Sequence, residues 1–532
     1  MKKRYLLDCT LRDGGYINDW EFGHDNIVNI FERVVASGTD FIEIGFIDDR
    51  RDFDINRSIF PDTSCAESIY GKLDRKNTVV VAMIDYGTCD ISRLQPASES
   101  YIDGIRVIFK KEKMKPAMEY CRQVKALGYK VFSQLVSVTS YSDEELKEVV
   151  GLANEIQPFA LSMVDTYGLM NPAELSHMMD IIDENMSRDI ILGFHAHNNF
   201  QLGFVNATTA LEYDTDRPVL VDGTLYGMGK SAGNAPLELI AMYMNEHMGK
   251  AYIITEMQEA ITTSVTDFQR RSPWGYQLFY YIAASNRVHP DYVSYLMNKR
   301  TLSITAVNEI LARLPEDQKL AKNMKLIEQL YMEHQKKECD DSADVKRLSS
   351  ELGDRQVLII GPGTTIVKNR EDILSYIEKN DPLIISINYI PHDYAPDYMF
   401  ITNATRALQS ATKLHDRENA GVRLIASSNL TRIERDFDYV VNYSDYIDEA
   451  AEFPDNSMCM LLRLLIKCGC KRAALAGLDG YTPDSVNYFD VDKAYDFLNE
   501  KAEMLNEYAR TFFDSISDRM EITFVTPSEY GG

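Results

Sequence analysis

The chain has 532 residues, with 56 Lys and Arg against 81 Asp and Glu, which gives a formal charge of −25. Hydrophobic residues make up 45%, enough apolar material to exclude a mainly disordered chain. The acidic balance argues against a nucleic-acid-binding surface, because phosphate binding needs clustered Lys and Arg. No apolar run approaches the ~18 residues of a membrane span. The eight cysteines are scattered, which is typical of reduced thiols. We therefore expect a cytoplasmic protein without nucleic-acid or membrane partners.

The first 230 residues read as strands that alternate with helices. Segments between the strand candidates carry the apolar spacing of amphipathic helices, as in EYCRQVKALGY. The strand candidates lie about 30 residues apart, which is the length of one βα unit. They are residues 4–10, 41–47, 78–85, 104–109, 130–138, 159–165, 190–197 and 218–224. Eight even units predict a closed (β/α)8 TIM barrel, with an open doubly wound sheet as the alternative.

A second α/β pattern follows after a charged stretch. Its strand candidates are residues 356–365, 383–388, 398–403, 422–428, 437–443, 472–479 and 521–527, and residues 458–469 read as a buried helix. We predict three parts: a barrel with a helical extension over 1–300, a helical, charged linker over 301–352, and a Rossmann-like α/β domain over 353–532. The fold class is therefore α/β in both halves.

Polar residues gather where the predicted barrel strands end, and in a barrel these ends carry the functional groups. They include Asp13, Glu43, Gln134, Asp165, His195, His197, Asp222 and Asn234. The His195-x-His197 spacing is the sharpest of these features, because residues i and i+2 of a strand face the same side. Both imidazoles can therefore ligate one metal, with the Asp13 carboxylate completing an open, catalytic type of site. The alternative is a pair of hydrogen-bonded histidines.

Two charged residues flank this predicted site. Arg12 precedes Asp13 and keeps its charge, so beside a metal it would suit an enolate or carboxylate oxygen; its alternative is a structural ion pair. Glu43 lies inside an apolar strand, where a carboxylate must be paired, hydrogen-bonded or functional.

Five motifs occur in order along the barrel: LDCTLRDGGY (7–16), IEIG (42–45), VDTYGLMNP (164–172), FHAHNNFQLGFVNA (194–207) and DGTLYGMGKSAGNAPLE (222–238). Together they resemble the successive signatures of the metal-dependent aldolase and acyl-CoA-condensing superfamily. Its members include 4-hydroxy-2-oxovalerate aldolase, hydroxymethylglutaryl-CoA lyase, isopropylmalate synthase and the carboxyltransferase part of pyruvate carboxylase. The resemblance covers roughly residues 4–300 and is nearest to the aldolase branch.

The resemblance implies a divalent ion, Mn2+ or Mg2+, bound by Asp13, His195 and His197, with Asn234 as a further ligand or close neighbour. Zinc is the other metal that imidazole and oxygen ligands admit. The resemblance also implies that Arg12 stabilises the enolate of a 2-oxo acid or thioester, and that Glu43 lies near the waters of the metal. The shared chemistry makes or breaks a carbon–carbon bond through that enolate, with the metal as Lewis acid.

The sequence departs from the best-known branches at the proton-transfer group. The aldolase branch has a His three residues after the metal Asp, where this chain has Tyr16, a poor base at neutral pH. The lyase branch has a Cys in the glycine-rich segment after the eighth strand, and the synthase branch has Glu-Gln after the first motif; both are absent here. The candidates for proton transfer are Tyr16, Glu43 and His289, and a capping or surface role is the alternative for His289.

We therefore predict a divalent-metal-dependent aldolase-like lyase that acts on a small 2-oxo acid such as pyruvate and an aldehyde. The resemblance also implies a homodimer. One alternative is a Claisen-type acyltransferase that uses acyl-CoA. Another is a non-catalytic barrel that serves as a scaffold for a nucleotide-binding C-terminal module.

The C-terminal half offers weaker signals. GPG (361–363) follows an apolar strand and is a candidate phosphate cradle, with a plain tight turn as the alternative. TNATR (402–406) and AGLDG (476–480) faintly resemble sialyltransferase-like and motility-accessory glycosyltransferase domains, which implies a nucleotide or sugar nucleotide ligand. Cys468 and Cys470 read as core thiols.

Overall fold

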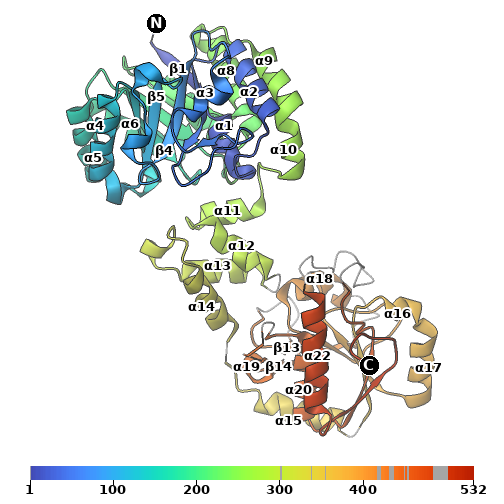
Figure 1. Cartoon of the computed structure of the whole chain (residues 1–532). Coiled ribbons are helices and arrows are strands. Elements are labelled where there is room, and N and C mark those ends of the chain that lie inside the picture. Colours follow the sequence, from blue (N-terminus) through green and yellow to red (C-terminus); the bar gives the residue numbers. More distant parts are fainter. Residues whose placement is uncertain are drawn as a thin grey trace. The chain divides into compact units, whose positions relative to one another are not determined.

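The structure is a computed structural model and describes residues 2–299, 302–336, 338–353, 355–415, 421–430, 437–448, 450–451, 454–482 and 501–531. The chain divides into two compact units, Met1–Pro290 and Asp291–Gly532 (Figure 1). Within the described part, every helix is too short or too polar to span a bilayer. The predicted boundary at residues 300 and 301 lies outside the described residues, so the three-part division stays a prediction.

A closed barrel of parallel strands forms the first unit. The strand order is β1-β9-β8-β7-β6-β5-β4-β2, and β1 pairs with β2 to close the barrel. Its strands are β1 (Arg4–Asp8), β2 (Phe41–Ile47), β4 (Val79–Asp85), β5 (Gly104–Phe109), β6 (Lys130–Leu135), β7 (Ala160–Asp165), β8 (Ile191–Ala196) and β9 (Val219–Gly223). This confirms the predicted barrel, strand by strand. The two-residue strand β3 (Ile59–Phe60) pairs with β2 and was not predicted, because it is too short to show a period.

Helices between the strands cover the outside of the barrel (Figure 1). They are α2 (His24–Ala36), α3 (Cys65–Tyr70), α4 (Met114–Ala126), α5 (Asp143–Ile156), α6 (Pro172–Asn185), α7 (Gly203–Glu212) and α8 (Leu237–Met248), followed by α9 (Ile254–Ala260), α10 (Thr266–Arg271) and α11 (Leu278–Ser285). Two of them begin with capping boxes, in which Ser142 pairs with Glu145 and Asn171 with Glu174. These caps satisfy the free N–H groups that every helix start exposes.

Side chains that point into the barrel form layers. Nearest the amino ends of the strands is an apolar layer, consisting of Leu7, Cys9, Phe41, Val81, Phe132, Ala160, Ile191 and Leu220. Two residues further along the strands, the interior becomes polar, with Glu43, Arg106, Gln134, Ser162 and Asp222, all buried. The strand period of two places both layers inside. The polar layer therefore lies between a dry floor and the carboxyl end of the barrel, which we call the mouth.

Gly45 creates a bend in β2 next to this polar layer. The pairing of β2 with β4 shifts register between Glu43 and Phe46, and Gly45 has φ of +144°. A Cβ at this position would lie 1.9 Å from the carbonyl oxygen of Ser58. The neighbouring chain is fixed, because the Ser58 hydroxyl donates to the carbonyl of Leu11 at 2.6 Å. Glycine is therefore required where the strand must turn Glu43 inward and Phe46 toward the mouth.

We predict that Gly45→Ala lowers the free energy of unfolding of the barrel by roughly 2–4 kcal/mol, because the new methyl group must displace backbone. Gly151→Ala is the matched control: Gly151 lies in α5, nothing surrounds its Cβ position within 4 Å, and the change should be neutral or stabilise by up to ~1 kcal/mol. Urea-dependent hydrogen exchange of barrel peptides measures both. Equal stability of the two variants would contradict the assigned constraint.

The second unit contains a parallel sheet of seven strands, in the order β14-β13-β12-β11-β10-β15-β16. The strands are β10 (Val357–Ile360), β11 (Leu383–Ile387), β12 (Tyr398–Ile401), β13 (Arg423–Ser427), β14 (Tyr439–Val441), β15 (Arg472–Ala476) and β16 (Glu521–Phe524), at the seven predicted positions. The order runs outward from β10 in both directions, as in doubly wound folds. This confirms the α/β class for the second unit.

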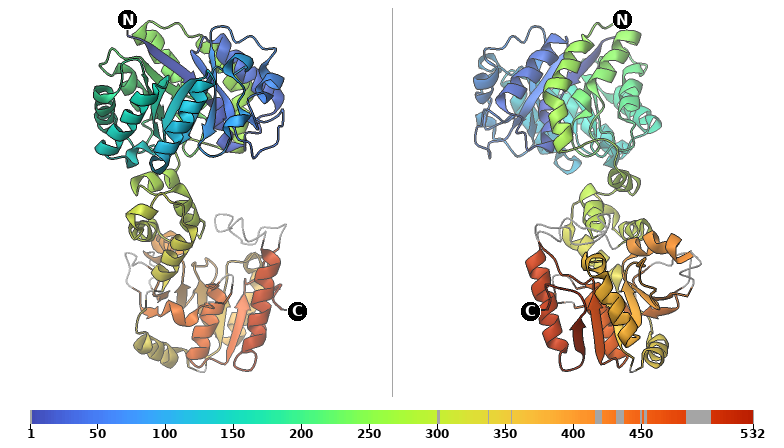
Figure 2. Two further views of the ribbon diagram at one scale, coloured as in Figure 1. Left: turned by 60° about the vertical axis from the view of Figure 1, so that its left-hand side comes forward. Right: turned by 90° about the vertical axis from the view of Figure 1, so that its right-hand side faces the viewer.

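Helices cover both faces of this sheet (Figure 2). Alternate residues of β10 point to opposite faces of the sheet. Val357 and Ile359 pack against α15, α20 and α22, whereas Leu358 and Ile360 pack against α16 and α17. The helices of the unit are α12 (Pro290–Asn298), which begins at the last residue of the first unit, α13 (Ile304–Ala312), α14 (Met324–Gln335), α15 (Ser342–Leu352), α16 (Thr365–Lys368), α17 (Arg370–Asn380), α18 (Ala404–His415), α19 (Tyr443–Tyr446), α20 (Ser457–Lys467) and α22 (Ala502–Ile516). The continuous apolar run of β10 follows from burial on both faces.

Candidate metal centre

Four side chains predicted as metal ligands meet at the mouth of the barrel. His195 lies on β8, and His197 follows the end of that strand and bridges to Asn234 on the loop after β9. Asp13 ends the one-turn helix α1 (Thr10–Asp13), which continues from β1. The ligand atoms of Asp13, His195 and His197 all lie within 4.8 Å of one another, and the Asn234 amide donates to Asp13 Oδ2. The closed barrel thus joins segments that are about 180 residues apart in the chain.

The atoms that face this point have no hydrogen-bond partner among the residues that the structure describes. His195 Nε2, His197 Nε2 and Asn234 Oδ1 are buried and accept or donate no hydrogen bond. The closest charged neighbour of His197 Nε2 is Asp13 Oδ2 at 3.5 Å. Unsatisfied buried polar atoms are costly, and three of them converge here. Two imidazole nitrogens, a carboxylate and an amide oxygen form a donor set that suits a divalent ion with open positions.

Each imidazole is held by its other nitrogen. His195 Nδ1 lies 3.0 Å from Asp222 Oδ2, and His197 Nδ1 lies 3.0 Å from the carbonyl oxygen of Asp165. A carbonyl only accepts, so Nδ1 of His197 carries a proton, and in the neutral ring Nε2 is then the lone pair. Burial lowers the pKa of His195, which keeps that ring neutral. Both rings are therefore in the tautomer that ligates through Nε2.

A buried ionic network underlies the ligands. Arg106 is fully buried and donates from Nη1 to Glu43 Oε2 at 2.9 Å and from Nη2 to Asp222 Oδ2. The same Glu43 oxygen accepts from Arg12 Nε at 2.7 Å, and Arg12 Nη1 donates to Asp13. One guanidinium thus fixes both Glu43 and Asp222, and through them Arg12 and His195. We infer that Arg106 positions the site without touching the reacting atoms.

Sequence reasoning missed Arg106 and gave Asp222 no role. GIRVIF reads as an apolar strand, and the only available signal was one charge at an inward position of that strand. The carboxylate partners of Arg106 lie on β2 and β9, 63 and 116 residues away, so spacing along the chain cannot reveal them.

The network sets the protonation of the carboxylates. Burial raises the pKa of Asp13, but the Arg12 guanidinium together with His197 and His195 more than offsets it and holds that pKa well below the ordinary range. Asp222 behaves in the same way beside Arg106. Burial raises the pKa of Asp165 to about 6, although its carboxylate accepts from the N–H groups of Leu169 and Met170. Asp13 and Asp222 are therefore anionic at neutral pH and suited to a cation and to a metal-ligating imidazole.

The remaining predicted site residues lie at different depths. Tyr16 stands on the wall of the mouth, its ring 5.0 Å from Trp20 and 6.1 Å from Phe46. Desolvation raises the pKa of the Tyr16 hydroxyl, so the phenol keeps its proton. His289 packs at 6.1 Å against Tyr167, in the loop that follows β7, and does not join the cluster of ligand atoms. Of the three proton-transfer candidates, Glu43 is linked to Asp13 because both accept hydrogen bonds from Arg12. Tyr16 is close enough to Arg12 and Asp13 for their charges to act on its hydroxyl.

The glycine turn of the C-terminal unit is closed by its own chain. Gly361 N donates to Ala476 O at 2.9 Å, and Gly363 N donates to Gly477 O at 2.7 Å. Asp479 Oδ2 accepts from Thr365 N at 2.9 Å. These N–H groups already have acceptors, and a carboxylate lies where a phosphate cradle was one candidate, which favours the alternative of a plain tight turn. The turn packs β10 against β15.

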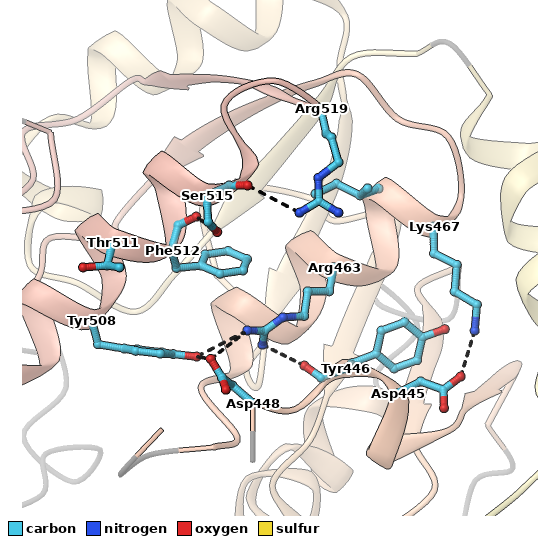
Figure 3. A pocket seen from close by; sticks show the side chains of 11 residues that line it. Asp445, Tyr446, Asp448, Arg463, Lys467, Tyr508, Thr511, Phe512, Ser515 and Arg519 are labelled. Atoms are coloured by element: carbon cyan, nitrogen blue, oxygen red, sulfur yellow. Dashed lines mark hydrogen bonds and ion pairs between the residues drawn. The ribbon is translucent and has the colours of Figure 1, made fainter. Parts of the chain in front are cut away.

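A surface pocket of about 630 Å³ lies between α20 and α22 (Figure 3). Its cations have acceptors at hand: Arg463 Nη1 donates to Tyr446 O at 2.9 Å, and Lys467 lies 3.0 Å from Asp445. Figure 3 shows Arg519 donating to the backbone of Ser515, at 3.5 Å. The cations that line this pocket are paired with groups of the same chain. The pocket therefore lacks the converging unpaired donor atoms that the mouth of the barrel has.

The barrel matches one family model along its whole length. Residues 3–267 match the model described as HMGL-like. The barrel is an HMGL-like domain. This membership agrees with the superfamily resemblance seen in the five motifs. The model ends before α11, so it does not extend to the C-terminal unit.

Curated relatives share about half of this chain. The 4-hydroxy-2-oxovalerate aldolase 2 of Salinispora arenicola is 26% identical over 273 residues, which are 51% of this chain and 77% of the relative. The 4-hydroxy-2-oxovalerate aldolase of Shewanella halifaxensis is 25% identical over 271 residues, 50% of this chain and 78% of the relative. The oxaloacetate decarboxylase of Mycobacterium tuberculosis is 24% identical over 285 residues, which are 51% of this chain and 78% of the relative. Among solved structures, the HMG-CoA lyase of Bacillus subtilis has a TM-score of 0.42 at 17% identity and covers 52% of this chain and 95% of that chain.

We predict that Asp222→Asn weakens Mn2+ binding to the HMGL-like barrel about 10- to 100-fold, because the partner that orients His195 loses its charge. The change also leaves Arg106 short of one anion, which destabilises the fold. Asp183→Asn is the matched control. Asp183 pairs with the buried Arg217 at a distance of 2.7 Å, and this pair lies away from the ligands. Isothermal titration calorimetry gives the affinity and urea unfolding gives the stability. A loss of Mn2+ affinity that is equal in both variants would show that only folding was affected.

Proposed function

We propose that the barrel is a divalent-metal-dependent, aldolase-like lyase that makes or breaks a carbon–carbon bond through the enolate of a small 2-oxo acid such as pyruvate. The observation that carries the proposal is the convergence of unpartnered donor atoms from His195, His197 and Asn234 around Asp13, with the Arg12 guanidinium beside them. The relatives named 4-hydroxy-2-oxovalerate aldolase support this reaction class.

In this proposal Asp13, His195, His197 and Asn234 hold Mn2+ or Mg2+. The bound ion would supply Lewis acidity toward the carbonyl and carboxylate of the 2-oxo acid. Arg12 keeps one donor for the substrate: Nε and Nη1 are engaged by Glu43 and Asp13, and no described residue accepts from Nη2. A fixed cation whose free N–H faces the developing enolate oxygen stabilises it without reorganisation.

For proton transfer, the same geometry supports Tyr16 as the donor and Glu43 as the acceptor. The raised pKa of Tyr16 favours a role as proton donor to a developing alkoxide over a role as base near neutral pH. Glu43 uses one oxygen to hold two guanidiniums, and its buried Oε1 has no partner, so it is the carboxylate available to a water or substrate proton. His289, packed on Tyr167, would act from the rim.

The partners would be a 2-oxo acid together with an aldehyde, in a homodimer. The eight cysteines are all free thiols, which fits the reducing cytoplasm that we propose as its location. Acyl-CoA remains the substrate class of the competing Claisen reaction.

The first test is deuterium exchange into the methyl group of pyruvate, followed by NMR, with Mn2+ or Mg2+ and with a chelator control. We expect metal-dependent exchange that Asp13→Ala and His197→Ala reduce by at least about 100-fold, because the ligand set is broken. The surface variant His177→Ala should exchange normally, since His177 is exposed and pairs with the exposed Asp143, away from the ligands. Metal binding without exchange would move the assignment to acyl-CoA substrates, and absence of metal binding would overturn it.

We further predict that Tyr16→Phe slows aldol cleavage by about 100-fold while Mn2+ affinity stays unchanged, because a proton donor is lost and no ligand is touched. Tyr226→Phe is the matched control, a tyrosine at the mouth that is 48% exposed. Steady-state cleavage and calorimetry give the two readouts. Full activity of Tyr16→Phe would transfer the role of donor to another group.

A further inference from the structure

Lys230 lies on the glycine-rich loop that follows β9, and the backbone of this loop is held rigidly. Gly233 N donates to Lys230 O at 3.0 Å, and Asn234 N donates to Gly227 O at 3.0 Å. The loop is also tied to the segment after β8, because Ala232 N donates to Asn199 Oδ1 at 3.2 Å. These hydrogen bonds place the Cα of Lys230 beside the predicted ligands.

The loop passes directly over the metal ligands. A Cβ at Gly229 would lie 2.0 Å from Asn234 Nδ2 and 2.6 Å from Asp13 Oδ2. The backbone next to Lys230 thus borders the Asp13 carboxylate. The lysine side chain leaves this point toward Tyr16, with Nζ 5.4 Å from the centre of the Tyr16 ring.

The ammonium group of Lys230 has no carboxylate partner among the described residues. Other half-buried lysines of the barrel have carboxylates, such as Lys111 with Glu145 at 3.0 Å and Lys250 with Asp40 at 3.2 Å. Lys230 makes no ion pair with any residue that the structure describes, and the face of Tyr16 is its neighbour. A cation–π contact at a partly exposed site stabilises weakly, by about 0.5–1 kcal/mol. An anion at this position would bind better than the ring.

We propose that Lys230, standing over the Tyr16 ring, forms a subsite for a second anionic group of the substrate, a carboxylate or a phosphate. This inference rests on the proposed function and gives it a substrate class: the acceptor is an anionic aldehyde or oxo acid. Arg12 has one free guanidinium nitrogen, which the 2-oxo acid end engages. A second negative charge therefore needs another cation, and Lys230 is the one beside the ligand-bearing loop.

Matched ligands test the subsite by calorimetry on the Mn2+-loaded full-length protein. The pairs are 2-oxoglutarate with 2-oxopentanoate, and 2-oxoadipate with 2-oxohexanoate; the members of each pair differ only in the distal carboxylate. We expect the diacid of at least one pair to bind about 30-fold more tightly, as for a hydrogen bond between charged groups. Lys230→Met should remove the difference and leave the monoacid affinity unchanged. Lys230→Arg should keep most of it, and Lys147→Met, on the exposed face of α5, should keep all of it.

The outcomes separate the two proposals. If monoacids bind and diacids bind no better, or if Lys230→Met weakens both alike, the subsite is overturned and the proposed function stands. If neither class binds the metal-loaded protein, the proposed function itself fails.

Aldol addition to pyruvate distinguishes carboxylate from phosphate: succinic semialdehyde is compared with butanal, and glyceraldehyde 3-phosphate with glyceraldehyde. A Lys230-dependent preference in either pair supports the proposal and names the anion, and no preference in both overturns it.

Discussion

The guanidinium of Arg106, buried inside the barrel, is the constraint on which the site depends. A lone charge in such an interior costs far more than any single contact returns, so it must be paired and hydrogen-bonded. Its partners are Glu43, Asp222 and Gln134, all buried. Satisfying Arg106 therefore fixes two carboxylates at defined depths, and each then serves the mouth. Glu43 holds Arg12, and Asp222 holds His195. The hydrogen bonds and ion pairs offset the cost of burying Arg106, and they also preorganise the groups above it.

Charge counting extends this reasoning to the occupant. The network of Arg12, Arg106, Asp13, Glu43 and Asp222 contains two cations and three anions, an excess of one negative charge before the histidines are counted. A divalent ion reverses that excess to one positive charge, and the carboxylate of a 2-oxo acid then balances it. A buried site close to neutrality in its loaded state avoids the solvation cost of a net charge. The Nε2 atoms of His195 and His197, which have no partner among the described residues, also favour a bound cation. A proton on either nitrogen would add positive charge at the position proposed for the metal.

The sequence predicted the periodic parts of this molecule and the residues that lie close together along a strand. The eight barrel strands follow from evenly spaced apolar runs and the seven sheet strands from apolar runs alone, and His195 and His197 follow from the two-residue period. What spacing did not reveal are the ion pairs across the interior of the barrel. Arg106 meets Asp222 only because β5 and β9 face each other across the interior, a relation set by closure. The turn at Gly361 and Gly363 is the tight turn that the sequence left as the alternative to a phosphate cradle; its acceptors, Ala476 and Gly477, lie at the end of β15, more than a hundred residues away.

The two features of the mouth that concern selectivity are adjacent, and their adjacency has a physical reason. Tyr16 stands where the aldolase branch has a histidine, and Lys230 is the cation above its ring. A protonated imidazole there would repel the ammonium group, whereas the negative face of a phenol attracts it and keeps the side chain extended. Under the proposed function, tyrosine at this position would serve two ends: it would retain a proton for transfer, and it would support a cation beside the reaction site. Recognition of the acceptor and donation of the proton would then meet at one aromatic side chain.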